Sequence, residues 1–185
     1  HHLQKMKEFH IITRHIGEKN KMLENFDLKR LQQEELDILD ELMRVCKEYN
    51  LTLFISGGSL LGAIRHKGFI PWDDDIDLGM PRKDYEKLVK IAPKALKESY
   101  VLQDNRLEKK CGLNFGKIRK KGTIMSENYS HHIDMSQGIW IDIFPYDKVS
   151  NDEKVRKKNM QKLSFYRNMY IIKSGYKAPE GKSKA

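Results

Sequence analysis

The feature that most constrains this chain is a run of four carboxylates within five residues, namely Asp73, Asp74, Asp75 and Asp77. The apolar residues Trp72, Ile76 and Leu78 flank or interrupt the run. This alternation predicts a strand that starts after Pro71 and places Asp73, Asp75 and Asp77 on one face, with Asp74 on the other. Three like charges on one face repel, so the pattern predicts a divalent cation with oxygen ligands, Mg²⁺, Mn²⁺ or Ca²⁺ rather than zinc.

A solvated acidic turn and a calcium loop both fit this run less well. A solvated turn would not alternate with apolar residues, whereas Trp72, Ile76 and Leu78 are expected to anchor this segment to a core. A calcium loop of the EF-hand type would need glycine at its sixth position and glutamate at its twelfth. Here those positions hold Leu78 and Asp84. The pattern therefore favours a cation site on a strand.

A second motif, Ser56-Gly57-Gly58-Ser59, follows a short apolar run that predicts a buried strand over 51–55. Ser59 is expected to cap a helix over 60–66, and the N–H groups at a helix start can bind an anion. Glycine at Gly57 and Gly58 would let a phosphate approach the backbone closely, although such a turn can also be a simple connection. An anion site followed by a cation site predicts phosphoryl or nucleotidyl transfer.

The rest of the chain predicts an α+β fold around one mixed sheet. Apolar residues at three- and four-residue steps predict a helix from Asp27, its N-cap, to Asn50, its C-terminal stop, with Glu34, Glu35, Asp37, Glu41 and Lys47 on the polar face. A second helix is expected over 83–96, with Pro93 as a kink or restart. Further strands are expected over 100–103, 112–118 and 139–144, and a last helix after a capping box formed by Ser150 and Glu153. Residues 1–26 read as a tag remnant and N-terminal segment, 27–174 as one catalytic domain and 175–185 as a flexible tail.

Composition limits the classes of partner. The chain has 185 residues, is 39% hydrophobic and 33% charged, and holds no apolar run near the length of a membrane-spanning helix. Its net charge of +9 favours an anionic partner, such as a nucleotide, a phosphorylated polymer, nucleic acid or a membrane surface. Cys46 and Cys111 do not form a metal-binding pattern and are expected to be buried free thiols in a reducing compartment.

Asp142 is a lone carboxylate between large apolar neighbours, Ile141 and Ile143. One interpretation pairs it with a buried Arg or Lys, because buried charges persist only when paired. The other places its strand beside the acidic strand, so that Asp142 joins the same metal centre and takes a proton from an acceptor hydroxyl. Among the basic residues, Arg65, Lys117 and Arg119 are candidates to bind a phosphate, with Lys117 and Arg119 on one strand face.

The stretch from Ser56 to Tyr85, SGGSLLGAIRHKGFIPWDDDIDLGMPRKDY, strongly resembles the LicD family, and WIDIFPYD, from Trp140 to Asp147, resembles a second block of that family. This family includes bacterial phosphocholine transferases and is similar to the fukutin-type ribitol-phosphate transferases. The resemblance implies the nucleotidyltransferase fold, with a mixed sheet flanked by helices. It also implies Asp75 and Asp77 as metal ligands, Asp73 as an added ligand or neighbour of the metal, and a third carboxylate at Asp142.

These observations predict a cytoplasmic Mg²⁺-dependent transferase, in which Mn²⁺ could replace Mg²⁺, with contact to the inner face of the membrane. The resemblance implies a CDP-linked donor, with CDP-choline as the leading candidate, and as acceptor a sugar hydroxyl of a lipopolysaccharide, teichoic acid or lipid-linked glycan precursor. The backbone of Gly57, Gly58 and Ser59 would orient the donor phosphate. One alternative loads a nucleotide from an NTP onto a small molecule or an RNA end. A second alternative, prompted by charge alone, is a non-catalytic module that binds nucleic acid or membrane, but it would not need the acidic run.

Overall fold

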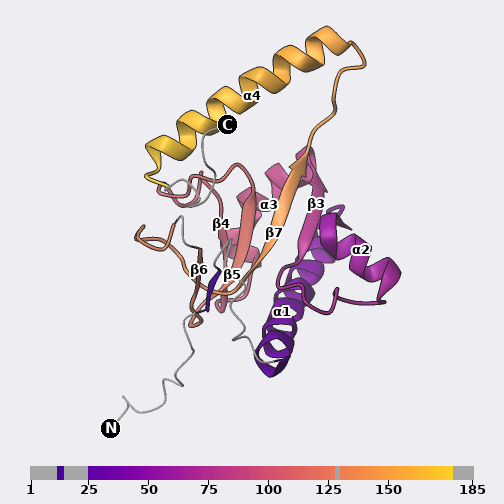
Figure 1. Cartoon of the computed structure of the whole chain (residues 1–185), viewed down its shortest axis with the longest axis vertical. Helices are drawn as coiled ribbons and strands as arrows, with labels where there is room; N and C mark the ends of the chain where they lie inside the picture. The colour runs from indigo at the N-terminus through magenta and orange to yellow at the C-terminus, as the bar shows by residue number, and fades with distance from the viewer. Residues whose placement is uncertain (1–11, 15–24, 128–129, 177–185) are drawn as a thin grey trace.

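The computed structural model describes residues 12–14, 25–127 and 130–176 (Figure 1). Within these ranges the helices are α1 (Asn25–Tyr49), α2 (Gly57–Arg65), α3 (Arg82–Ala95) and α4 (Glu153–Lys173). The strands are β1 (Ile12–Arg14), β2 (Phe54–Ile55), β3 (Asp77–Pro81), β4 (Tyr100–Gln103), β5 (Gly116–Lys120), β6 (Met125–Glu127) and β7 (Trp140–Tyr146). Most of the expected tail and most of the expected N-terminal segment lie outside the described residues.

The main sheet has the order β2-β3-β7-β5-β4, and β1 pairs with β6 in a separate small sheet. Strands β3 and β7 are parallel, whereas β2, β5 and β4 join the sheet in antiparallel pairs. Helices α1 and α3 pack behind the main sheet, and α2 lies at its β3 side (Figure 1). The predicted α+β fold with a mixed sheet flanked by helices is thus confirmed.

The two faces of the sheet have different roles. On β7, Ile141 and Ile143 are 0% exposed and belong to the hydrophobic core with residues of α1 and α3. Because side chains alternate along a strand, Asp142 points to the opposite face. The registers of β3 and β5 place Asp77 and Lys117 beside it on that face. One face therefore packs against the helices, and the other carries polar side chains, several of them buried beside the core residue Trp140.

Helix α1 follows the predicted period, with Leu31, Ile38, Leu42 and Val45 buried in the core. It ends at Tyr49, and Asn50 has a positive φ of 51°, which confirms the predicted stop. The predicted N-cap is wrong, because the helix already begins at Asn25 and Asp27 lies inside it.

The strand predictions around the acidic run need correction. Strand β3 begins only at Asp77, so residues 73–76 form no regular element and the predicted alternation of their side chains does not apply. The predicted buried strand over 51–55 is reduced to β2, an edge strand whose Phe54 is 38% exposed. Ser59 is not the N-cap of α2, because that helix starts two residues earlier and Ser56 occupies the cap position.

The later elements agree better with expectation. Helix α3 buries Tyr85, Leu88, Val89 and Ala92 and continues through Pro93 to Ala95 without a restart. Strand β4 has the predicted bounds, β5 runs over 116–120 rather than 112–118, and β7 runs over 140–146 rather than 139–144.

The last helix is present as predicted, but its cap is different. The Asp152 carboxylate accepts hydrogen bonds from the N–H groups of Lys154 and Val155, so Asp152 replaces the predicted capping box. Helix α4 buries no residue and runs along the top of Figure 1. None of the described helices is long and apolar enough to cross a membrane.

Candidate active site

The glycine turn and β3 are joined by backbone contacts that fix the start of α2. The N–H of Ser56 donates to the carbonyl of Asp77 at 3.0 Å, and the N–H of Asp77 donates to the Ser59 hydroxyl at 2.8 Å. Gly57 has a positive φ of 56°, and a Cβ at this position would lie 2.6 Å from Oδ2 of Asp77. Glycine is therefore required here, and the Asp77 carboxylate lies directly against the turn.

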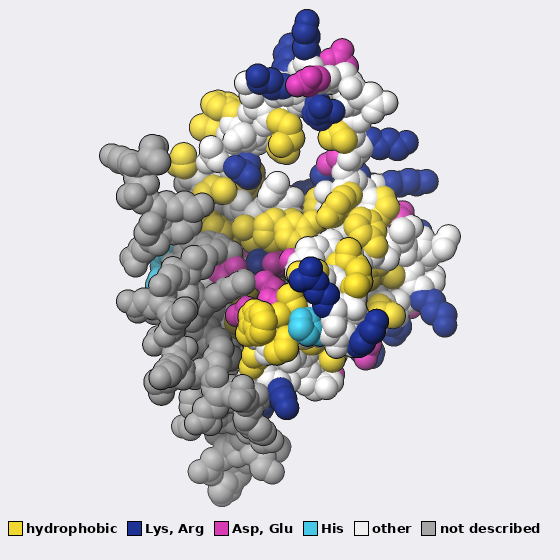
Figure 2. Space-filling view, turned by 45° about the vertical axis from the view of Figure 1, so that its right-hand side comes forward, with side chains coloured by type: hydrophobic (Ala, Val, Ile, Leu, Met, Phe, Trp, Pro, Cys, Tyr) yellow, Lys and Arg dark blue, Asp and Glu magenta, His cyan; other side chains and the backbone are white. Residues whose placement is uncertain are grey.

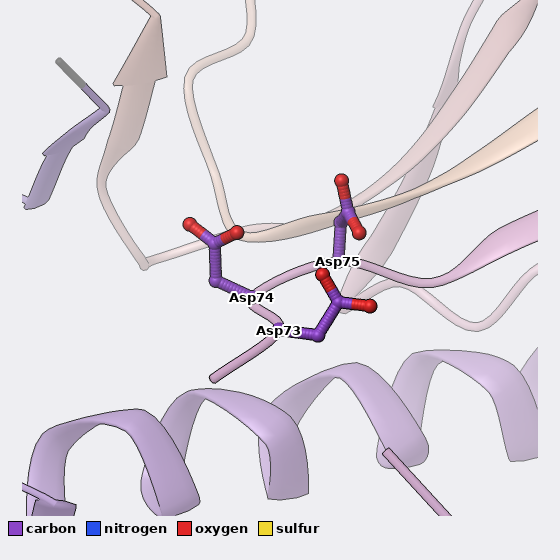
Figure 3. A group of neighbouring side chains, drawn as sticks. All are labelled: Asp73, Asp74 and Asp75. Carbon is purple, nitrogen blue, oxygen red and sulfur yellow. The ribbon is translucent and has the colours of Figure 1, made fainter. Parts of the chain in front are cut away.

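Asp73, Asp74 and Asp75 form a compact group in the segment that leads into β3 (Figure 3). One carboxylate oxygen from each lies within 4.8 Å of the others. Gln32 of α1 donates from Nε2 to the Asp73 carbonyl at 2.9 Å, which holds this segment over α1. Asp74 was predicted to point away, but it joins the group because the segment is not a strand.

Asp142 lies beside Asp77, as one of the two interpretations predicted. The two residues are Cα partners in the parallel pair of β3 and β7, and the Asp142 N–H donates to the Ile76 carbonyl at 2.9 Å. Adjacent strands are about 4.8 Å apart, so both carboxylates start from neighbouring points on the same face. The chain therefore brings Asp142 to the acidic segment from a position far along the sequence.

The ion-pair interpretation of Asp142 is met as well, because Nζ of Lys117 lies 2.8 Å from its Oδ1. Both side chains are buried, and Lys117 has a second partner in Glu127 at 3.5 Å. Burial raises the pKa of Asp142 above its usual value, and the Lys117 ammonium opposes this rise. Asp142 thus has a structural partner and a position at the acidic centre at once.

Of the three basic candidates, Lys117 and Arg119 share a face of β5, as predicted. The centroid of the Trp140 ring lies 4.2 Å from Nζ of Lys117 and 4.7 Å from Cζ of Arg119. Arg119 is 1% exposed and donates from Nε to Gln103 and from Nη1 to the Gly138 carbonyl. These partners are internal, so a phosphate contact by Lys117 or Arg119 stays a prediction.

Arg65 is exposed at the last residue of α2, whereas the glycine turn forms its first residues. A helix rises about 1.5 Å per residue, so roughly 12 Å of helix axis separates Arg65 from that turn. Only its long side chain could reach a ligand at the turn, and its predicted phosphate contact also stays a prediction.

The structure adds one carboxylate that sequence reasoning placed on the solvated face of α1. Glu35 is 0% exposed, and within the described part of the chain neither of its carboxylate oxygens has a hydrogen-bond partner. Burial raises the pKa of Glu35 to about 9, and the charges of Asp75, Asp74, Asp142 and Asp73 contribute to this rise. The sequence held a signal for it, because Glu35 interrupts the apolar spacing of Leu31, Ile38 and Leu42.

The acidic side chains gather near the centre of one face, with hydrophobic side chains above and below them (Figure 2). Trp72, which was expected to anchor the acidic run, is 77% exposed, so that expectation is wrong. Ile76 and Leu78, at 4% and 3% exposed, anchor the segment instead. Trp72 is therefore available to a ligand beside the carboxylates.

This arrangement can hold a divalent cation. The grouped oxygens of Asp73, Asp74 and Asp75, with Asp77 and Asp142 on adjoining strands, supply the hard oxygen ligands that Mg²⁺ and Mn²⁺ prefer. The first N–H groups of a helix have no partner within it, so those of α2 at Gly57 and Gly58 can meet a negatively charged group. A mixed sheet with carboxylates on neighbouring strands, next to a glycine turn, defines a nucleotidyltransferase-like domain.

Comparison with known proteins assigns the domain more closely. The sequence profile described as "LicD/FKTN/FKRP, nucleotidyltransferase domain" matches residues 50–177. The chain belongs to this family. The match includes α2, β3 and β7, which carry the glycine turn, Asp77 and Asp142.

The chain is also similar to individual relatives. It is 35% identical over 135 residues to the lipopolysaccharide cholinephosphotransferase LicD of Haemophilus influenzae, across 72% of this chain and 49% of that protein. It is 58% identical over 31 residues to the human ribitol 5-phosphate transferase FKRP, across 17% of this chain and 6% of that protein. An uncharacterised protein of Rickettsia typhi is 33% identical over 87 residues, 45% of this chain and 28% of that protein. The chain thus spans about half the length of the Haemophilus relative and less of the length of the other two.

Proposed function

We propose that this chain carries the catalytic centre of a divalent-cation-dependent transferase that moves phosphocholine from CDP-choline to a sugar hydroxyl of lipopolysaccharide or a related glycan. The observation that carries the proposal is the meeting of Asp77 with Asp142, next to the Asp73 to Asp75 group and the start of α2. The similarity to a lipopolysaccharide cholinephosphotransferase supports the choice of group transferred. A teichoic acid or lipid-linked precursor would offer the same acceptor chemistry.

The proposed reaction is a displacement at the phosphorus that bears choline. The oxygen of the acceptor hydroxyl bonds to this phosphorus, the bond from phosphorus to the bridging oxygen breaks, and CMP leaves with that oxygen. Asp142 accepts the hydroxyl proton, and Lys117 holds its carboxylate in position at 2.8 Å. The N–H groups of Gly57 and Gly58 orient the donor phosphates. Mg²⁺, when bound by Asp75 and Asp77, would lower the cost of the negative charge on the leaving oxygen.

Trp72 is proposed to contact the choline group. Its ring is 77% exposed and directly precedes Asp73 in the chain. A quaternary ammonium is attracted to the face of an aromatic ring, and Trp is the most effective ring for this contact. Neighbouring carboxylates add a further attraction for the cation. A donor that carries ribitol in place of choline would lose this contact.

The test is a screen of CDP-choline, CDP-ribitol and the four NTPs with a lipopolysaccharide or glycan acceptor in Mg²⁺. We expect release of CMP from CDP-choline, and no turnover with Asp75→Asn or Asp77→Asn at unchanged melting temperature. Each of those variants removes one ligand charge from a centre with few protein ligands.

The screen also separates the alternatives. Release of pyrophosphate from an NTP, without CMP from CDP-choline, would assign the chain to nucleotide transfer instead. Salt-sensitive binding of nucleic acid without any turnover would favour a binding module. Wild-type rates in Asp75→Asn or Asp77→Asn at ordinary Mg²⁺ would refute the proposed metal ligands. The proposed location is cytoplasmic, at the inner face of the membrane, and follows from the CDP-linked donor.

A further inference from the structure

Glu35 stands in α1 where the helix otherwise buries apolar side chains. Leu31, Ile38 and Leu42 precede and follow it at three- and four-residue steps and are at most 2% exposed. Glu35 itself is 0% exposed, and no hydrogen bond reaches either of its carboxylate oxygens from the described residues. A buried carboxylate without a partner is costly, so an apolar residue here would give a more stable helix packing. A contribution to stability therefore does not explain Glu35.

The turn of α1 that carries Glu35 lies under the acidic segment. Gln32, one turn earlier on the same face of α1, donates from Nε2 to the Asp73 carbonyl at 2.9 Å. In Figure 3, a helix of the colour of α1 runs directly beneath Asp73, Asp74 and Asp75. After burial, the charges of Asp75, Asp74, Asp142 and Asp73 are the further causes that raise the pKa of Glu35.

Another buried glutamate on the same helix shows what a structural role looks like. Glu41 is 3% exposed, yet Arg44 donates to it at 2.7 Å and the Lys97 N–H donates at 2.9 Å. Nζ of Lys97 lies 3.2 Å from its Oε2. The fold thus supplies cations and N–H groups to Glu41, whereas neither carboxyl oxygen of Glu35 has a partner among the described residues. A cation at the centre of these carboxylates would make their proximity favourable.

We propose that Glu35 is a further ligand of the divalent-cation centre, supplied by α1 from beneath the Asp73 to Asp75 group. The inference rests on the proposed function, because it uses the same cation. It extends the centre from the β3 and β7 side to the helix layer behind the sheet. Cation binding would then also tie α1 to the acidic segment, in addition to the hydrogen bond from Gln32.

The test uses Mn²⁺ alone as the probe, measured by calorimetry and by the electron paramagnetic resonance signal of free Mn²⁺. Wild type is compared with Glu35→Gln, which keeps the shape and removes the charge, and with the control Glu41→Gln on the same helix. We expect Glu35→Gln to raise the Kd for Mn²⁺ by about tenfold or more, as expected when one of few charged ligands is lost. Glu41→Gln should leave this Kd within about twofold, because its partners lie elsewhere.

A thermal melt gives a second readout. In EDTA, Glu35→Leu, which completes the apolar stripe, should melt above wild type, because a buried polar group without a partner is removed. Added Mn²⁺ should raise the melting temperature of Glu35→Leu and of Glu35→Gln less than that of wild type, and the leucine variant covers the case in which the glutamine variant does not fold.

The outcomes separate this inference from the proposed function. Mn²⁺ binding by wild type with an unchanged Kd in folded Glu35→Gln or Glu35→Leu would overturn the role of Glu35 and leave the cation centre in place. Absence of Mn²⁺ binding by wild type at millimolar concentration would overturn both. Loss of binding in Glu41→Gln as well would show a general effect on α1 and would overturn the assignment to Glu35.

Discussion

At the residue scale, the Asp142 carboxylate has both a place beside the acidic segment and a structural ion-pair partner. It lies beside Asp77 in the register of β3 and β7, and it pairs with buried Lys117. We predict that Asp142→Asn lowers turnover by on the order of 10², because the proton acceptor is lost. The free energy of unfolding should change by no more than about 1 kcal/mol, because Lys117 keeps Glu127 as a partner. Steady-state rates and urea unfolding of the same preparation measure both.

The opposite pattern would assign Asp142 to structure alone. Breaking a buried ion pair costs roughly 3–5 kcal/mol when the remaining charge has no other partner. A loss of that size, with normal turnover per folded molecule, would refute the catalytic role and make Asp142 simply the counter-ion of Lys117.

The two glycines of the turn give a matched pair of substitutions. At Gly57, alanine would meet both a positive φ and the Asp77 carboxylate, so Gly57→Ala should cost about 2 kcal/mol or more of stability. At Gly58 the nearest atom to an added Cβ is Asp73 Oδ2 at 3.3 Å, and φ is not positive. Gly58→Ala should therefore fold normally but bind CDP-choline more weakly, since its methyl group narrows the approach to the backbone. Urea unfolding measures the stability of the two variants, and calorimetry measures their affinity for CDP-choline. Equal stability and equal affinity of the two variants would contradict the prediction.

Sequence reasoning located Asp77 and Asp142 because each shows a local signal, a carboxylate in an apolar strand. It missed Glu35, although the signal was of the same kind. Helical periodicity does not fix where the apolar stripe ends, so a glutamate beside the stripe was interpreted as part of the solvated face. The depth of burial depends on what packs over the helix, and here that is the acidic segment from 41 residues along the chain, which Gln32 contacts.

At the scale of elements, the run before β3 shows where a period-two pattern fails. Alternation predicted a strand through Asp73 and Asp75, but strands also need hydrogen-bonded neighbours. Edge strand β2 pairs with β3 only at Leu78 and Gly79, and β7 begins to pair at Asp77. Residues 73–76 lie outside both registers, apart from the hydrogen bond that the Ile76 carbonyl accepts from the Asp142 N–H, so the side chains of residues 73–75 can converge instead of alternating. The grouping of Asp73, Asp74 and Asp75 depends on this irregular backbone, which no local pattern specifies.

The junction of α1 and α3 gives a prediction about pH. Hydrogen bonds from Arg44, with those from Lys97, lower the pKa of Glu41 from its ordinary value of 4.5 to about 2, against the effect of burial. Because the folded pKa is the lower one, this stabilisation is complete above about pH 4.5 and is lost as the pH falls towards 2. The free energy of unfolding of Glu41→Gln at pH 7 should therefore be roughly 2 kcal/mol below that of wild type. Each pKa unit corresponds to about 1.4 kcal/mol, and the value for the full shift is reduced because Arg44 is partly exposed to solvent.

The difference between wild type and Glu41→Gln should narrow as the pH falls from about 5 to about 2. Urea unfolding at several pH values measures it, and comparison of the two proteins cancels the titration of the other carboxylates. Parallel stability curves over this range would show that Glu41 is not held by its ion pairs.

At the scale of the whole molecule, the sequence was sufficient for the family and the α+β fold because both rest on long matching segments and strong periodicity. It did not specify which surfaces remain exposed, since exposure depends on how the elements pack. Helix α4 is the clearest case. Its sequence predicted a helix with apolar residues at several positions, yet Leu163, Phe165 and Tyr166 are 54%, 61% and 67% exposed.

Helix α4 should consequently be the least protected of the described helices. It has 21 residues against 25 in α1, but none of them is buried, and seven Lys or Arg accompany one Glu along it. Isolated helices in water are only marginally stable, and most helices in proteins owe their stability to the packing of one face. We predict that amide hydrogens of α4 exchange at least about 100-fold faster than those of α1, which opens only when the core does. Hydrogen exchange read by mass spectrometry on peptides from both helices measures this in one sample.

A pair of alanine substitutions tests the same difference in packing. Phe165→Ala in α4 should change the melting temperature by less than about 2 °C. Leu88→Ala in α3 should lower the free energy of unfolding by about 2–5 kcal/mol, because Leu88 is fully buried. Protection of α4 equal to that of α1 would contradict the expectation, and a dependence of that protection on protein concentration would identify a second copy of the chain as the surface that covers it.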